Sequence, residues 1–386
     1  MRQSISRIAP IVMGLTIAAF DVVTLPAAAQ PATPGPDLLG VSQSATAPTN
    51  PGLGTPSARQ AEPLVAPAGR RFVNVTSCSE SDLQAAIGSV ATVGGTVNLR
   101  PGCTYTLTDT VPPNDDNGLP VIKNSVTING RGDIITRAAT AANFRFFEIN
   151  GPNGNLTLNT LTLSNGHAAT GLGNGRGGAI WLNGAGSALT LNNSSLTTNT
   201  ADTFGGAIEN DSGAVSVNRS TLHNNKATAG GAVFVNPFGG SGMATFDRSR
   251  ITGNHATILA GGIAAAFGTK VTLTSTRVTG NDVTGNNAQG GGIAQAGTMT
   301  LKRSEVIGNT TTGAKAQGGG IFNTSGTVQL TRSPSPATPP TARTPAVAAS
   351  SIRAPARWLS PVARLPTTRR WEREQTVAAS SKPAAR

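Results

Sequence analysis

The sequence predicts an all-β fold, a single-stranded parallel β-helix (a solenoid) with a short helical cap on its N-terminal side. Composition supports a β architecture. The 386 residues include 47 Gly and 25 Pro, only 4% are aromatic and 12% are charged, which leaves too few large apolar residues for helical packing. A strand-like segment with alternating apolar and polar residues also recurs at a nearly constant spacing. No internal apolar run reaches about 18 residues, so we expect no transmembrane segment in the mature chain.

Residues 1–29 are typical of a secretory signal peptide. Arg2 and Arg7 supply a positive start, residues 8–25 are mostly apolar, and the three alanines at 27–29 suit cleavage before Gln30. An uncleaved anchor is the alternative, but the apolar stretch is short and an aspartate interrupts it. The sequence therefore predicts an exported protein, secreted or held at the cell surface.

Two segments separate this signal from the repeats. Residues 30–71 are rich in Pro and Ala and are expected to form a disordered linker, because they cannot bury enough apolar surface to offset ordering. Residues 72–110 are interpreted as an N-terminal cap. Within the cap, residues 81–87 have a short helical pattern, and Ser79 or Ser81 can serve as its N-cap. Residues 94–99 are expected to form a first strand.

The chain has only two cysteines, Cys78 and Cys103. An even count in an exported chain indicates a disulfide, and closing a loop of this length contributes about 3 kcal/mol in the chain-entropy picture. Two thiols without a nearby histidine cannot complete a tetrahedral metal site, so no metal is expected here.

The strand-like segment recurs six times within residues 111–333, the region that we assign to β-helix repeats. Its copies end in Ser or Thr at spacings of 26, 29, 27, 28 and 29 residues, and they are residues 189–194, 215–220, 244–249, 271–276, 299–304 and 328–333. Each repeat is predicted to hold three short β segments, which are too short to stand alone. Stacked about 4.8 Å apart they form parallel ladders with one repeat per coil. Residues 125–166 fit the same coil less regularly.

Two fixed positions mark the predicted corners of each coil. An asparagine follows the repeat Ser or Thr by five residues, at Asn199, Asn225, Asn254, Asn281 and Asn309. It tolerates a left-handed backbone and can stack its amide on the next coil. A Gly-Gly pair, which can supply a positive φ, opens the next segment at residues 177–178, 205–206, 230–231, 261–262, 291–292 and 319–320.

These repeats resemble those of a known class. Gly-Gly-Ala-Ile at residues 177–180 and 205–208, alternating with aliphatic-x-x-Asn, looks like the GGAI/FxxN repeat of polymorphic outer-membrane-type proteins. More broadly it is similar to bacterial right-handed parallel β-helix repeat proteins, and residues 78–107 resemble the caps of exported members. The resemblance covers about residues 72–333 and implies a right-handed solenoid on a bacterial surface. The Phe of FxxN is Leu, Ile or Val here, and we expect no translocating β-barrel after the repeats.

The repeat stops in mid-unit at Ser333, and residues 334–386 are expected to be a disordered tail. The tail is basic and Pro-rich, yet it retains the period of the repeats, because Val-Ala-Ala-Ser-Ser at 347–351 recurs at 377–381. Codons for Gly-Gly-Gly-Ile-Phe (residues 318–322) read one base late can give Val-Ala-Ala-Ser-Ser. We therefore interpret the tail as out-of-frame translation of further coils. The alternative is a natural basic tail, whose lack of regular aromatic–basic alternation argues against a nucleic-acid partner.

Little in the repeats indicates catalysis. Glu209 and Asp211 are the only close acidic pair between residues 177 and 333, and we interpret them as a solvated turn. The three histidines, at 167, 223 and 255, fall at different repeat positions and are not expected to form a row. No cofactor, metal or catalytic residue is predicted. The sequence favours a non-enzymatic role over the alternative, a polysaccharide lyase or glycoside hydrolase of the same fold.

One row of residues is a candidate binding site. The residue before each repeat Ser or Thr is often arginine, and two further arginines lie two residues beyond it. Together they form a predicted stripe of Arg219, Arg248, Arg250, Arg277, Arg303 and Arg332. Such a stripe can contact an anionic polysaccharide or cell-wall polymer. The alternative is that arginine at a corner only limits aggregation and aids solubility. The predicted function is an adhesin-like or glycan-binding surface protein.

Overall fold

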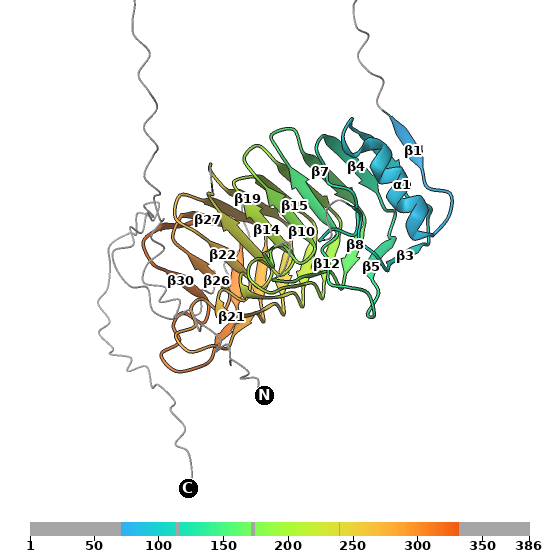
Figure 1. Cartoon of the computed structure of the whole chain (residues 1–386). Coiled ribbons are helices and arrows are strands. Elements are labelled where there is room, and N and C mark those ends of the chain that lie inside the picture. Colours follow the sequence, from blue (N-terminus) through green and yellow to red (C-terminus); the bar gives the residue numbers. More distant parts are fainter. Residues whose placement is uncertain (1–70, 113–115, 171–173, 239, 332–386) are drawn as a thin grey trace, which may run out of the picture.

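The computed structural model describes residues 71–112, 116–170, 174–238 and 240–331, and it is a stack of parallel coils (Figure 1). The described residues form four parallel sheets. The longest has ten strands: β1 (Phe72–Asn74), β2 (Gly95–Asn98), β4 (Ser125–Asn129), β7 (Asn155–Asn159), β11 (Ala188–Asn192), β15 (Ala214–Asn218), β19 (Met243–Asp247), β23 (Lys270–Thr274), β27 (Thr298–Lys302) and β31 (Thr327–Thr331). The parallel β-solenoid predicted from the repeat is confirmed.

Three further sheets complete each coil. The eight-stranded sheet holds β3 (Thr104–Leu107), β5 (Ile134–Arg137), β8 (Thr162–Ser164), β12 (Ser195–Thr197), β16 (Thr221–His223), β20 (Arg250–Thr252), β24 (Arg277–Thr279) and β28 (Glu305–Ile307). The six-stranded sheet holds β9 (His167–Ala168), β13 (Thr200–Ala201), β17 (Lys226–Ala229), β21 (His255–Leu259), β25 (Asp282–Val283) and β29 (Thr310–Thr311). The seven-stranded sheet holds β6 (Phe147–Asn150), β10 (Ile180–Asn183), β14 (Ile208–Asp211), β18 (Val233–Asn236), β22 (Ile263–Ala265), β26 (Ile293–Gln295) and β30 (Ile321–Asn323).

A full coil therefore has four strands rather than the three predicted. The additional strand belongs to the six-stranded sheet and follows directly on the corner asparagine. It is only two residues long in β9, β13, β25 and β29, which is too short to show alternation in the sequence. The chain visits the ten-, eight-, six- and seven-stranded sheets in that order.

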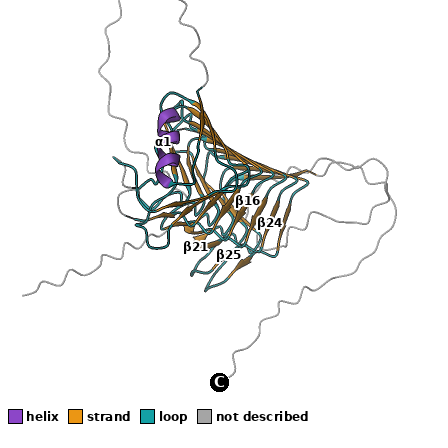
Figure 2. Ribbon diagram, turned by 90° about the vertical axis from the view of Figure 1, so that its right-hand side faces the viewer, coloured by secondary structure: helices purple, strands orange, loops and turns teal. Residues whose placement is uncertain are grey.

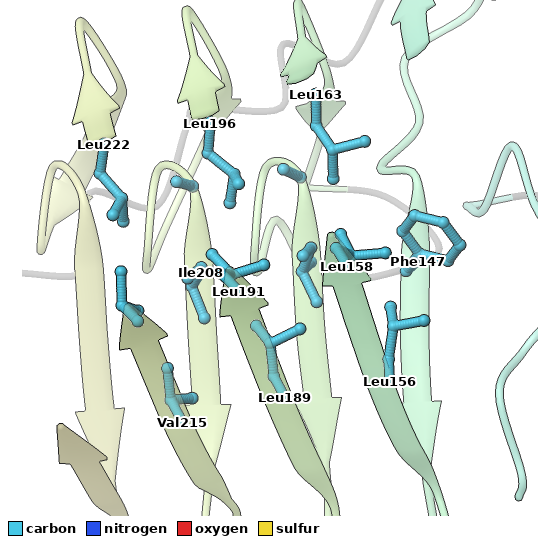
Figure 3. Close-up of a cluster of buried hydrophobic side chains, with 14 of the residues drawn as sticks. Phe147, Leu156, Leu158, Leu163, Leu189, Leu191, Leu196, Ile208, Val215 and Leu222 are labelled. Carbon is cyan, nitrogen blue, oxygen red and sulfur yellow. The ribbon is translucent and has the colours of Figure 1, made fainter. Parts of the chain in front are cut away.

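Aliphatic side chains stack in register to form the core. Leu156, Leu189 and Val215 occupy the same position on neighbouring strands of the ten-stranded sheet. Leu163, Leu196 and Leu222 do the same on the eight-stranded sheet. Figure 3 shows these rows converging with Phe147 and Ile208 from the seven-stranded sheet. All of them are buried in one continuous cluster, so each coil buries its apolar face against the next.

The corner asparagines form a buried hydrogen-bonded ladder. Each amide donates from Nδ2 to Oδ1 of the asparagine in the next coil, at 3.0, 2.9, 2.8 and 2.8 Å from Asn199 through to Asn309. The same Oδ1 also accepts the backbone N–H of the preceding ladder asparagine. The predicted stacking is confirmed, but the left-handed backbone lies one residue earlier, for example at Thr198 and Asn224.

In the later coils, the residue with a positive φ lies one position before the predicted Gly-Gly pair. From β10 to β30, a positive φ falls three residues before the first aliphatic residue of each strand of the seven-stranded sheet, and in one coil that residue is Ala260, at φ 51°. The next position is glycine in each of these six coils, because backbone crowding there excludes a side chain. A Cβ at Gly206, for example, would collide with the carbonyl oxygen of Gly231.

The N-terminal cap contains α1 (Glu80–Ala91), which covers the first coils in Figures 1 and 2. Ser79 is its N-cap and accepts the backbone N–H of Asp82 at 3.2 Å. Leu83 and Ile87 are fully buried against the core. Cys78 and Cys103 form the predicted disulfide, with their Cα atoms 5.3 Å apart. The cap is part of the solenoid, because β1 and β2 continue the ten-stranded sheet.

Several sequence predictions concern residues beyond the described ranges. The signal peptide, almost all of the linker, and the tail, together with Arg332, lie outside them. Within the described part of the chain, no helix has the length and apolar character needed to cross a membrane.

Candidate anion-binding site

The arginines of the predicted stripe lie where the ten-stranded sheet turns into the eight-stranded sheet. Arg219, Arg248 and Arg303 occupy the same corner on different coils, all with left-handed φ of 47–49°. Asn193 and Ser275 occupy this corner in two other coils with the same backbone. The following Ser or Thr fixes the corner: the Ser249 hydroxyl, for instance, donates to backbone carbonyls and accepts the Ser220 N–H. All three arginine side chains are exposed.

A second basic row runs beside the first on the outer face of the eight-stranded sheet. Arg250 on β20 is in register with Arg277 on β24, which is in register with Glu305 on β28. Parallel strands lie about 4.8 Å apart, so the two arginines are held next to each other, and like charges at such positions repel. The strand register therefore places two arginines side by side on neighbouring coils.

These two rows enclose a depression of about 250 Å³. It is lined by Arg248, Ser249, Arg250, Ser275, Thr276, Arg277, Arg303 and Glu305. Ser275 has a small side chain where neighbouring coils carry Arg248 and Arg303, which leaves space between those two arginines. Four of the eight lining residues are arginines and one is acidic, so the depression favours an anion.

The arginines of the depression are only partly neutralised. Arg277 Nε lies 2.9 Å from Glu305 Oε2, and Arg248 Nη1 lies 3.7 Å from Asp247 Oδ2. No ion pair joins Arg219 or Arg250 to another residue in the part of the chain described. Since these two ion pairs are exposed and weak, an incoming anion can compete for Arg248 and Arg277.

A second charged cluster lies on the outer face of the seven-stranded sheet, and the sequence interpretation of it was wrong. Glu209 and Asp211 belong to strand β14 rather than to a solvated turn, and they are only 0% and 3% exposed. Asp211 Oδ2 accepts hydrogen bonds from Arg176 Nη1 at 2.8 Å and from Trp181 Nε1 at 3.0 Å. Arg145 in turn lies over the Trp181 ring, 5.0 Å from its centroid.

Glu209 is the least satisfied group of this cluster. Neither of its carboxyl oxygens has a hydrogen-bond partner, and Arg176 Nη1 is 3.8 Å away. Burial raises the pKa of Glu209 well above its ordinary value, the neighbouring Asp211 charge raises it further, and Arg176 opposes both effects only in part. Burial therefore favours the neutral form of Glu209, while the neighbouring Asp211 side chain accepts two hydrogen bonds.

A second apolar cluster lies beside this group, outside the main core. Phe234, which is in register with Glu209, belongs to it together with Leu259, and Phe204 packs against it. Sequence reasoning also missed Arg176 and Trp181, although a signal was present. Gly-Gly-Ala-Ile is followed by Trp181 in one coil and by Glu209 in the next, so the repeat itself places Trp181 and Glu209 in one row.

Two of the three histidines share a row, so the prediction that the histidines form no row was wrong for this pair. His167 and His255 occupy the same row of the six-stranded sheet, separated by Thr200 and Lys226. His167 Nε2 lies 2.9 Å from Asp202 Oδ1, and His255 Nδ1 lies 2.8 Å from Asp282 Oδ2. Among the residues whose placement is described, no three His, Cys, Asp or Glu side chains gather to hold a metal ion.

Comparison with known proteins gives no relative: no family model, no curated protein and no solved structure matches the chain.

Proposed function

We propose that this chain is an exported or cell-surface β-solenoid that binds an anionic polysaccharide or cell-wall polymer without cleaving it. The observation that carries this proposal is the arginine-lined depression, in which strand register holds Arg250 beside Arg277 and leaves Arg250 without an ion-pair partner among the described residues. The predicted signal peptide and the resemblance to bacterial GGAI-type surface repeats support an extracellular setting. Because the stripe runs along the solenoid axis, an extended polymer can contact several coils at once.

Binding of an acidic polysaccharide to variants tests the proposal. The stripe variant replaces arginines by residues that other coils carry at the same positions. Each corner arginine becomes Asn, as at Asn193, in Arg219→Asn, Arg248→Asn and Arg303→Asn. The strand arginine becomes Thr, as at Thr221, in Arg250→Thr. The matched control variant also loses four positive charges, elsewhere on the surface: Arg131→Asn, Lys315→Asn, Lys123→Gln and Lys226→Gln. The stripe variant should lose most of its binding at low salt, and the control should retain it. Equal binding by both variants would leave the stripe with only a structural role.

A second candidate function, cleavage of a polysaccharide, is favoured by one observation. A buried carboxyl whose pKa is raised, beside a second carboxyl and close to arginine and tryptophan, is a combination of groups that suits acid-assisted glycosidic cleavage. The complete burial of Glu209 counts against this candidate, because a catalytic acid must contact its substrate. Cleavage requires that the protein release new reducing ends from acidic polysaccharides and that Glu209→Gln abolish the release. Absence of any release by the wild-type protein excludes it.

A further inference from the structure

We propose that the depression contains a binding position for one carboxylate group of the bound polymer, between Arg250 and Arg277, and that Glu305 competes for this position in the free protein by pairing with Arg277. This inference rests on the proposed function, since it specifies which acidic group the arginine stripe receives. It also assigns Glu305 a role in setting affinity.

Glu305 differs in charge from the residues at the same register position on the other coils. Successive coils place Thr162, Ser195, Thr221, Arg250, Arg277 and Glu305 at one register position of the eight-stranded sheet. Among the described residues at this position, Glu305 is the only acidic one, and it follows directly on the two arginines. Its carboxylate turns onto Arg277, with 2.9 Å between Oε2 and Nε. The depression therefore already holds one carboxylate, supplied by the protein itself.

The contact is weak enough to be exchanged. The side chains of Arg277 and Glu305 are 49% and 36% exposed, and ion pairs at such exposure contribute little. Glu305 also lies at the end of the row, so it adjoins Arg277 but not Arg250. A carboxylate of the polymer can lie between the two arginines and contact both, which relieves their mutual repulsion as Glu305 does not.

The internal carboxylate indicates the chemistry of the ligand. A sugar acid of the uronate class presents the same planar two-oxygen group, which guanidinium groups bind well. A polymer of such sugars running along the solenoid axis would place one acidic group in the depression and others over Arg219 and Arg303.

Equilibrium binding of a short oligogalacturonate tests the role of Glu305. Glu305→Gln frees Arg277 and should increase affinity about two- to fivefold, the range expected for removing a weak exposed ion pair. Glu305→Thr, which installs a residue already present in this row, should give the same gain. The matched control is Asp109→Asn, which changes the net charge equally at an exposed site in the cap and retains the side-chain oxygen that accepts the Thr110 N–H. Asp109→Asn should leave the affinity unchanged.

The possible results separate this inference from the proposed function. If both Glu305 variants bind the oligomer more tightly than the wild-type protein does, and this increase is lost when the oligomer is methyl-esterified, the results support a carboxylate-binding position. If the Glu305 variants bind no more tightly than Asp109→Asn, or if the ester shows the same increase in affinity, the carboxylate-binding position is excluded, while the arginine stripe remains a possible polyanion site. If neither the wild-type protein nor any Glu305 variant binds acidic oligosaccharides at low salt, the proposed function itself fails.

Discussion

The buried carboxyl group of Glu209 should make the stability of the fold decrease as the pH rises. Its pKa is raised in the folded state, chiefly by burial, so the folded protein retains a proton that the unfolded chain releases. Stability from this group is fully present below the ordinary Glu pKa, and it is lost as the pH rises toward the folded pKa. The group therefore opposes folding at neutral pH.

Glu209→Gln should consequently stabilise the protein at pH 7. The amide has the size of the protonated acid and cannot ionise, so the gain should be at least about 1 kcal/mol, the equivalent of less than one pKa unit. Denaturant unfolding at pH 4 and pH 7 measures it: the variant and the wild-type protein should converge at pH 4 and separate at pH 7. A wild-type protein more stable than the variant at pH 7 would contradict the burial of an uncompensated carboxyl group.

Besides the buried corner ladder, asparagines at the ends of neighbouring strands of the ten-stranded sheet form an outer ladder, in which Asn218 donates to Asn192 and Asn192 donates to Asn159. The two ladders should contribute differently to stability. Asn254 is fully buried, and its removal leaves the Asn225 N–H and amide without their acceptor, so Asn254→Ala should cost about 2–3 kcal/mol. Asn218 lies on the outer face of the ten-stranded sheet and makes one side-chain bond, 3.0 Å to Asn192, so Asn218→Ala should cost less than about 1 kcal/mol. Chemical unfolding of both variants gives the comparison, and equal costs would show that the inner ladder is not a stabilising network.

At the scale of elements, the disulfide should stabilise the cap. Cys78 immediately precedes the N-cap residue of α1, and Cys103 is buried next to β3, so the bond ties the helix to the first coils. Replacing the pair as Cys78→Ser with Cys103→Ala should lower the stability of the cap by about 3 kcal/mol. Thermal unfolding with and without reductant provides the check: reductant should lower the Tm of the wild-type protein and leave the variant unaffected. An equal response in both proteins would mean that the thiols are not bonded.

The sequence was sufficient to predict those elements whose signal repeats along the chain. The strands of the ten- and eight-stranded sheets and the asparagine ladder recur at a fixed period, and α1 has a recognisable cap at Ser79. The two-residue strands of the six-stranded sheet were missed because they contain no alternation. The burial of Glu209 was missed because Phe234 and Leu259, which belong to the apolar cluster outside the main core, come from other coils than Glu209. Contacts between coils at irregular corners leave no local pattern.

At the scale of the whole molecule, the affinity for a polyanion should depend more on where the arginines lie along the solenoid than on the net charge of the chain. The chain carries a formal charge of +12, but part of this lies in residues 334–386, outside the described structure. The depression between β20, β24 and β28 concentrates four arginines on three successive coils. Affinity for a polyanion should therefore depend on these arginines, and salt should weaken it by screening their contacts.

The salt dependence of acidic-polysaccharide binding, measured for the stripe variant and its matched four-charge control, tests this account most directly. The control should bind with an affinity that falls steeply as salt rises, as the wild-type protein should, because its arginine contacts are intact. The stripe variant should bind weakly with a shallow salt dependence, although its net charge is the same. Identical affinities and identical salt dependence in the two variants would show that net charge alone attracts the polymer, and would contradict a binding site at the arginine-lined depression.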